Sequence, residues 1–218
     1  NLNNSGQKLH DFNSNVVLEE IKEGPVKIYK FIPPNSSKDK YGIYFHGGGY
    51  FAGSITSHKN LISQISNDSN LIIYFFEYRL SPEYNFPSAH EDAKLAVDFI
   101  NTLHPDHQSI WIGESAGGGL ATGLVVDKEY LEKPDNLILL SPWLDLSDGF
   151  EDKKFFKNSD VTIIIEGMFE VGEFYAGKYG AKNPILSPVY GVATGGVELS
   201  SDDIPTAVLY DAILYPTS

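Results

Sequence analysis

The chain has 218 residues, enough for one domain with a substantial core, and we expect residues 1–218 to form a single unit. Its 29 acidic residues outnumber 16 lysines and arginines, and the net charge of −13 argues against nucleic acid or an anionic membrane as a partner. The absence of cysteine excludes disulfides, thiolate catalysis and cysteine-ligated metals. No run reaches the roughly 20 apolar residues that span a bilayer. We expect a cytoplasmic protein, and the sequence leaves a homodimer open.

Short apolar runs recur along the chain and predict strands. The first region, 16–34, holds two strand-like runs with a turn at Glu23-Gly24. Five further strands are expected, at 41–46, 71–78, 109–113, 136–142 and 204–210. The run LIIYFFEY at 71–78 is continuously apolar, which is typical of a strand buried on both faces of a sheet.

Helical patterns separate these strands. Helices are expected at 57–68 and 87–103, and a third begins at Ser115. Within 87–103 the apolar stripe is expected to contain Ala93, Leu95, Ala96, Phe99 and Ile100. Alternating strands and helices predict an α/β fold, with a mainly parallel sheet flanked by helices and chemistry at the carboxyl ends of its strands.

One segment, 148–182, breaks the alternation. It is first charged and then aromatic, and it has helical stretches but no clear strand pattern. We interpret it as a helical excursion over the sheet and a candidate lid. Ordinary surface helices are the alternative that composition alone leaves open.

The stretch Gly113-Glu114-Ser115-Ala116-Gly117 has the form G-x-S-x-G. Such a pattern is weak alone, but here it follows an expected strand and opens an expected helix, which is the setting of a nucleophile elbow. The flanking glycines suit a cramped turn, because side chains there would clash with neighbouring elements. The N–H groups that begin the helix point toward negative charge developing on a substrate.

A second glycine-rich stretch, His46-Gly47-Gly48-Gly49-Tyr50, directly follows the strand at 41–46. Successive glycines let backbone N–H groups approach a substrate oxygen, as a hydrolase requires at the tetrahedral intermediate. A merely flexible loop is the alternative reading. We expect His46 to shape this loop rather than to transfer protons, since it precedes the donors.

Four motifs together resemble the hormone-sensitive-lipase-like branch of the α/β-hydrolases. They are HGGGYFAGS (46–54), EYRLSPEYNFPSAHEDA (77–93), GESAGGGLA (113–121) and SPWLDLS (141–147). The segments NPILSPVYG (183–191) and IPTAVLY (204–210) look like later parts of the same branch. The resemblance implies a serine esterase or lipase that acts on short to medium acyl esters, with a small-molecule ester as partner and no metal or organic cofactor.

The resemblance also implies roles for individual residues. Ser115 matches the nucleophile, and the N–H groups of Gly48, Gly49 and Ala116 match the oxyanion hole. His46, Gly47 and Glu114 match supporting loop positions. Tyr78, Arg79, Pro82 and Glu83 match a structural turn, and we expect Arg79 to make an internal ion pair there.

The catalytic triad of this fold runs Ser, then Asp or Glu, then His along the chain. Asp211 is the natural candidate for the acid, although the segment before it is shorter than the family pattern. All six histidines precede Ser115, so none fits the triad position. Three explanations stay open: a sequence that lacks its C-terminal helix, strand and histidine, a natural truncation, or a base from elsewhere.

Two functions follow from this pattern. The first is a serine carboxylic-ester hydrolase working through an acyl-enzyme, although we expect the 218 residues alone to show little turnover. The second is a catalytically inactive, ligand-binding protein, because the same family includes plant hormone receptors that keep the pocket without working catalysis.

Overall fold

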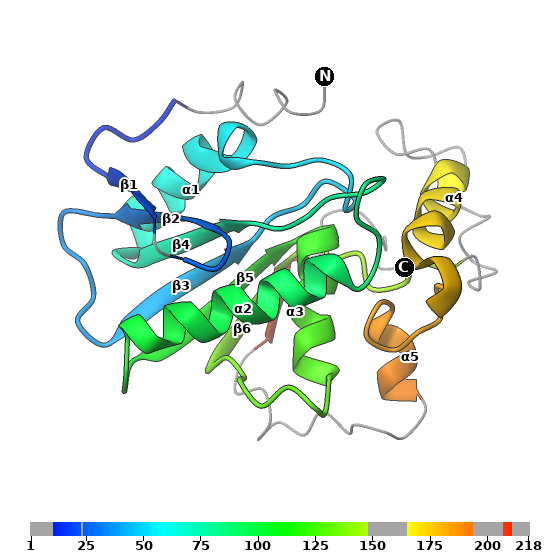
Figure 1. Ribbon diagram of the computed structural model, residues 1–218. Coiled ribbons are helices and arrows are strands. Elements are labelled where there is room, and N and C mark those ends of the chain that lie inside the picture. The colour runs from blue at the N-terminus through cyan, green and yellow to red at the C-terminus, as the bar shows by residue number, and fades with distance from the viewer. Residues whose placement is uncertain (1–10, 23, 148–164, 194–206, 211–218) are drawn as a thin grey trace, which may run out of the picture.

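The computed structural model describes residues 11–22, 24–147, 165–193 and 207–210. In this part of the chain a seven-stranded sheet forms the centre, in the order β1-β2-β4-β3-β5-β6-β7 (Figure 1). The strands are β1 (Val17–Ile21), β2 (Lys27–Ile32), β3 (Lys40–Phe45), β4 (Ile72–Glu77), β5 (Gln108–Glu114), β6 (Asn136–Leu140) and β7 (Ala207–Tyr210).

The sheet is mainly parallel, as the alternation of elements predicts. Strands β4, β3, β5, β6 and β7 run parallel to one another, whereas β2 pairs antiparallel with both β1 and β4. Residues Ile73 to Phe76 of β4 are buried, because helices cover both faces of the sheet where this strand lies. Parallel pairing of β3, β5 and β6 places their carboxyl ends at one edge.

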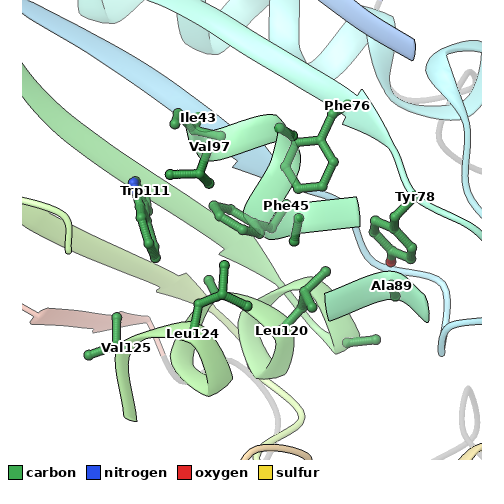
Figure 2. Packing of buried hydrophobic residues seen from close by; sticks show 14 of the residues in the cluster. Ile43, Phe45, Phe76, Tyr78, Ala89, Val97, Trp111, Leu120, Leu124 and Val125 are labelled. Atoms are coloured by element: carbon green, nitrogen blue, oxygen red, sulfur yellow. The ribbon is translucent and has the colours of Figure 1, made fainter. Parts of the chain in front are cut away.

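Helices α1 (Ile55–Ser69), α2 (Ser88–Leu103) and α3 (Ala116–Val126) cover the sheet. Helix α1 packs on one face, where Ile62 belongs to the same buried cluster as Tyr44 and Phe75, and α2 and α3 pack on the other (Figure 1). On that second face, Leu120 and Leu124 of α3 lie below Phe45 and Trp111 of the sheet (Figure 2). Every residue of α3 is buried, which fits its central position behind the strands.

The expected stripe of α2 is wrong at one residue. Leu95 is 49% exposed, and the buried face is instead made by Ala89, Ala93, Ala96, Val97 and Ile100. These positions follow the i, i+3, i+4 spacing of a single helix face, and Leu95 falls outside it. Small side chains on this face let the helix approach the sheet closely.

The turn after β4 is fixed by ion pairs, as the sequence predicts for Arg79. The Arg79 guanidinium lies 2.9 Å from Asp92 and 3.0 Å from Glu91, both on α2. The carboxylate of Asp92 also accepts the backbone N–H of Arg79 at 2.8 Å. The buried Asp92 therefore ties the turn to the start of α2 through side chain and backbone together.

The described part of 148–182 is helical, as expected, and comprises α4 (Ile165–Ala176) and a 3-10 turn (Gly177–Tyr179). Residues 148–164 of the candidate lid lie outside the described residues. Tyr175 of α4 stacks on Tyr50, the residue that directly follows Gly49, with ring centroids 4.1 Å apart. Helix α5 (Pro188–Ala193) lies near α4 (Figure 1). None of the described helices is long and apolar enough to cross a membrane.

Candidate active site

Ser115 lies at the junction of β5 and α3 in a strained conformation, with φ 50° and ψ −118°. Neighbouring backbone holds this residue on both sides. Its N–H donates to the Leu140 carbonyl at 3.0 Å, and its carbonyl accepts the N–H groups of Trp143 at 2.8 Å and Gly119 at 3.1 Å. Strain of this kind persists only where surrounding structure over-determines it, and it is common at functional sites.

The Ser115 side chain stands at the N-terminus of α3 and is half-buried. It makes no capping hydrogen bond, and no side chain among the described residues pairs with its hydroxyl. The first N–H groups of α3 have no acceptor inside the helix, and the helix dipole is positive at this end. A negative charge forming beside Ser115 would be stabilised by both effects.

The glycine loop that follows β3 lies directly against this turn. A Cβ atom on Gly117 would lie 2.1 Å from the Phe45 carbonyl oxygen and 2.5 Å from that of His46. A Cβ on Gly47 would lie 3.2 Å from the Glu114 carbonyl oxygen. The structure therefore brings the two glycine-rich motifs backbone to backbone, although they are more than 60 residues apart in the sequence.

The loop itself has a backbone that only glycine adopts readily. Gly48 has φ +115° and Gly49 has φ +64°. The Gly48 carbonyl accepts the N–H groups of Phe51 and Ala52, both at 3.0 Å, which closes the turn. A Cβ on Gly49 would meet no atom within 4 Å, so open space lies beside this residue.

His46 is fully buried at the start of this loop. Its ring stacks on that of Tyr78, with centroids 4.0 Å apart and planes 5° from parallel. Its Nδ1 lies 2.8 Å from the Gly47 carbonyl oxygen. Burial lowers the pKa of His46 to about 3, so the ring is neutral near pH 7. These contacts fit a residue that shapes the loop.

His90 and His104 have partners on other elements. His90 is buried on α2, where it faces Gly123 of α3, and burial lowers its pKa to about 3. His104 accepts from or donates to the Tyr74 hydroxyl at 2.7 Å and stacks on Tyr41, at the amino end of β3. Asp211, the expected triad acid, lies outside the described residues.

We expect the free energy of unfolding to depend on pH because two histidines are deeply buried. His46 and His90 change from an ordinary pKa of 6.5 in the unfolded chain to about 3 in the folded protein. Between these values the unfolded state binds more protons, so stability is full above pH 6.5 and falls as the pH drops toward 3. Between pH 7 and pH 5 each histidine should cost about 2 kcal/mol of unfolding free energy.

Urea unfolding at pH 7 and pH 5 measures this effect. His90→Leu removes one titrating group. The fall in unfolding free energy between pH 7 and pH 5 should therefore be about 2 kcal/mol smaller for this variant than for the wild type. An equal loss in the variant and the wild type would contradict the prediction.

Within the described part of the chain, no three side chains of His, Asp or Glu gather as ligands for a metal ion.

The sequence analysis missed two residues near the elbow. Tyr44 of β3 donates its hydroxyl to the Glu114 carboxylate at 2.8 Å, and His58 Nε2 of α1 lies 3.4 Å from the same oxygen. No local pattern marks these partners, because they meet Glu114 only in the folded chain.

Comparison with known proteins identifies the family of the chain. The family model described as alpha/beta hydrolase fold matches residues 42–210. An acetyl-hydrolase of Streptomyces hygroscopicus is 27% identical over 169 residues, which cover 76% of this chain and 56% of that protein. An ethyl acetate hydrolase of Pseudomonas putida is 33% identical over 134 residues, which cover 56% of this chain and 42% of that protein.

Solved structures give the same result. A hormone-sensitive lipase from a metagenome library superposes with a TM-score of 0.76 at 31% identity, over 84% of this chain and 63% of that one. An esterase from the bacterial hormone-sensitive lipase family superposes with a TM-score of 0.75 at 27% identity, over 83% and 62%. The chain thus spans less than two thirds of the length of these relatives. It belongs to the alpha/beta hydrolase family, in its hormone-sensitive-lipase-like branch.

Proposed function

We propose that this chain carries the nucleophile and the oxyanion-binding groups of a serine carboxylic-ester hydrolase. The observation that supports the proposal is the strained turn at Ser115, packed backbone to backbone against the glycine loop at the N-terminus of α3. A strained serine between a strand and a helix is the arrangement of a nucleophile elbow. The names of the acetyl-hydrolase and ethyl acetate hydrolase relatives support small acyl groups as the preferred substrates.

In this mechanism the Ser115 hydroxyl attacks the ester carbonyl carbon. The carbonyl oxygen becomes an oxyanion, which accepts the N–H groups of Gly48, Gly49 and Ala116. As the carbon–oxygen bond to the alcohol breaks, the leaving oxygen takes the proton that the base removed from Ser115. Water then attacks the acyl carbon, which frees the carboxylic acid and restores the Ser115 hydroxyl. His46, Gly47 and Glu114 support the loop and the elbow rather than contact the substrate.

A base must take the proton from Ser115. His46 and His90 are buried against Tyr78 and Gly123, and His104 lies at the opposite end of β3. The Nε2 of His58 faces Glu114. We therefore place the histidine of the triad outside the described residues, with Asp211 as the acid that orients it. In this proposal α4 borders the ester site, since its Tyr175 stacks on Tyr50 beside the glycine loop.

Ester hydrolysis and covalent labelling test the proposal in the natural protein at full length. We expect turnover of p-nitrophenyl acetate and butyrate, and a lower kcat/KM with long acyl chains. Diisopropyl fluorophosphate should stop turnover, and mass spectrometry should find the phosphoryl adduct on the peptide that contains Ser115. Turnover with an adduct on another residue would overturn the assignment of the nucleophile.

A ligand-binding protein without catalysis is the second candidate. It is favoured by one observation: no described side chain pairs with the Ser115 hydroxyl. This candidate predicts no ester turnover by the full-length protein, together with a rise in Tm when a small ester or carboxylate binds. Turnover that the phosphoryl adduct abolishes would exclude it.

A further inference from the structure

The carboxylate of Glu114 lies beside the groups that are proposed to bind the oxyanion. Glu114 immediately precedes Ser115, and its Oε1 and Cδ lie 3.2 Å from the position that a Cβ on Gly47 would occupy. Gly48 and Gly49 follow directly along the loop. A carboxylate in a half-buried place repels a second negative charge that forms nearby. The oxyanion would therefore be destabilised by Glu114 unless the charge of the carboxylate were offset.

Two side chains from other elements meet the carboxylate at its second oxygen, Oε2. The buried Tyr44 hydroxyl donates to it at 2.8 Å, and His58 Nε2 lies 3.4 Å away. The exposed fraction of the His58 side chain is 12%, and that of Glu114 is 36%. Burial raises the pKa of Glu114, but the His58 ring and the Tyr44 hydroxyl lower it by more, so the carboxylate stays ionised.

The surroundings of His58 fix which ring nitrogen faces Glu114 with a proton. Nδ1 lies 2.8 Å from the Ser57 hydroxyl and 3.2 Å from the Ser54 carbonyl oxygen, within its own helix turn. Nε2 faces a carboxylate, which only accepts, so a favourable contact requires a proton on Nε2. The other titratable rings near His58 are those of His46, with centroids 5.4 Å apart, and Tyr44, at 6.2 Å.

We propose that His58 is a positioning residue, whose Nε2–H holds and offsets the Glu114 carboxylate so that the glycine loop can bind the oxyanion. The proposal rests on the esterase function proposed above. His58 lies on α1, the helix that follows the glycine loop, and does not contact the reacting atoms in this scheme. It acts through Glu114, with Tyr44 as the second donor to the same oxygen.

Steady-state kinetics of the full-length protein test the role of His58. His58→Leu should lower kcat about 10- to 100-fold and change KM less than about threefold, because it acts on the transition state. His58→Gln, which keeps an N–H group for Glu114, should lose less. His107→Leu is the matched control and should keep the wild-type kcat, because His107 is only partly buried and its ring lies against His104, not against Glu114.

The double variant His58→Leu/Glu114→Gln tests whether His58 offsets the charge of Glu114 or only packs against it. Removing the charge of Glu114 should raise kcat at least about tenfold above that of His58→Leu, because no carboxylate held by Tyr44 alone remains near the oxyanion. If the two substitutions lower kcat additively, or if His58→Leu keeps the wild-type kcat, the proposal is wrong.

A measurement without turnover distinguishes this proposal from the esterase function. Long-range ¹H–¹⁵N correlation of the histidine rings should show a proton on His58 Nε2 in the wild type. In Glu114→Gln the Nε2 resonance should shift, whereas that of His107 should not. An unprotonated Nε2, or a resonance indifferent to Glu114→Gln, overturns the contact even in a protein that hydrolyses esters. If no ester is hydrolysed, the proposed function fails and this spectrum alone decides whether His58 holds Glu114.

Discussion

Ser115→Ala is expected to lower kcat for p-nitrophenyl butyrate by a factor of about 10⁴ or more in the full-length protein. The substitution removes the only atom that would form the acyl bond, while the N–H groups of the loop and of α3 stay in place. Substrate binding should therefore survive, and KM should change little. The Ser115 side chain makes no capping hydrogen bond and alanine keeps the Cβ, so the free energy of unfolding should change by no more than about 0.5 kcal/mol.

Ser141→Ala provides a matched control for this variant. Ser141 also has a positive φ, 45°, and it directly follows β6, the strand beside β5. Its replacement should leave kcat within about threefold of the wild type, since small changes that avoid the reacting atoms cost little. Hydrolysis by Ser115→Ala at the wild-type rate would show that another group attacks the ester.

The course of the chain through the sheet could be predicted because each strand carries its own signal. The continuous apolar run of β4 and the short run that ends at the glycine loop identify buried parallel strands without reference to the rest of the chain. The position of Ser115 could be predicted for the same reason. A strand, a serine between two glycines and a helix are all consecutive in the sequence.

Other features depend on contacts that the sequence does not encode locally. The pattern of α2 favours Leu95 as a core residue, and only the packing of the helix shows that Val97 takes that place. His58 looks like an ordinary polar residue of an amphipathic helix. Its role depends on Glu114, which lies 56 positions later and reaches α1 only through the order of the strands.

Gly117→Ala is expected to lower the free energy of unfolding by about 3 kcal/mol or more. A Cβ at this position would lie 2.1 Å from the oxygen and 2.4 Å from the carbonyl carbon of Phe45. Both are backbone atoms at the end of β3, a strand paired on both sides, so they cannot move aside without breaking the sheet. Helix α3 must move instead, and it is buried along its whole length.

Gly167→Ala in α4 is the matched control, because a Cβ there would meet no atom within 4 Å. This change should leave the free energy of unfolding unchanged or raise it by up to about 1 kcal/mol, because alanine has a higher helix propensity than glycine. Urea unfolding of both variants measures the difference. If Gly117→Ala still folds, the shift of α3 away from the glycine loop should also slow the reaction of Ser115 with diisopropyl fluorophosphate. A Gly117→Ala protein with the wild-type urea midpoint and the wild-type rate of reaction with diisopropyl fluorophosphate would contradict this prediction. The elbow and the glycine loop would then not be packed backbone to backbone, and the oxyanion site built on that contact would be wrong.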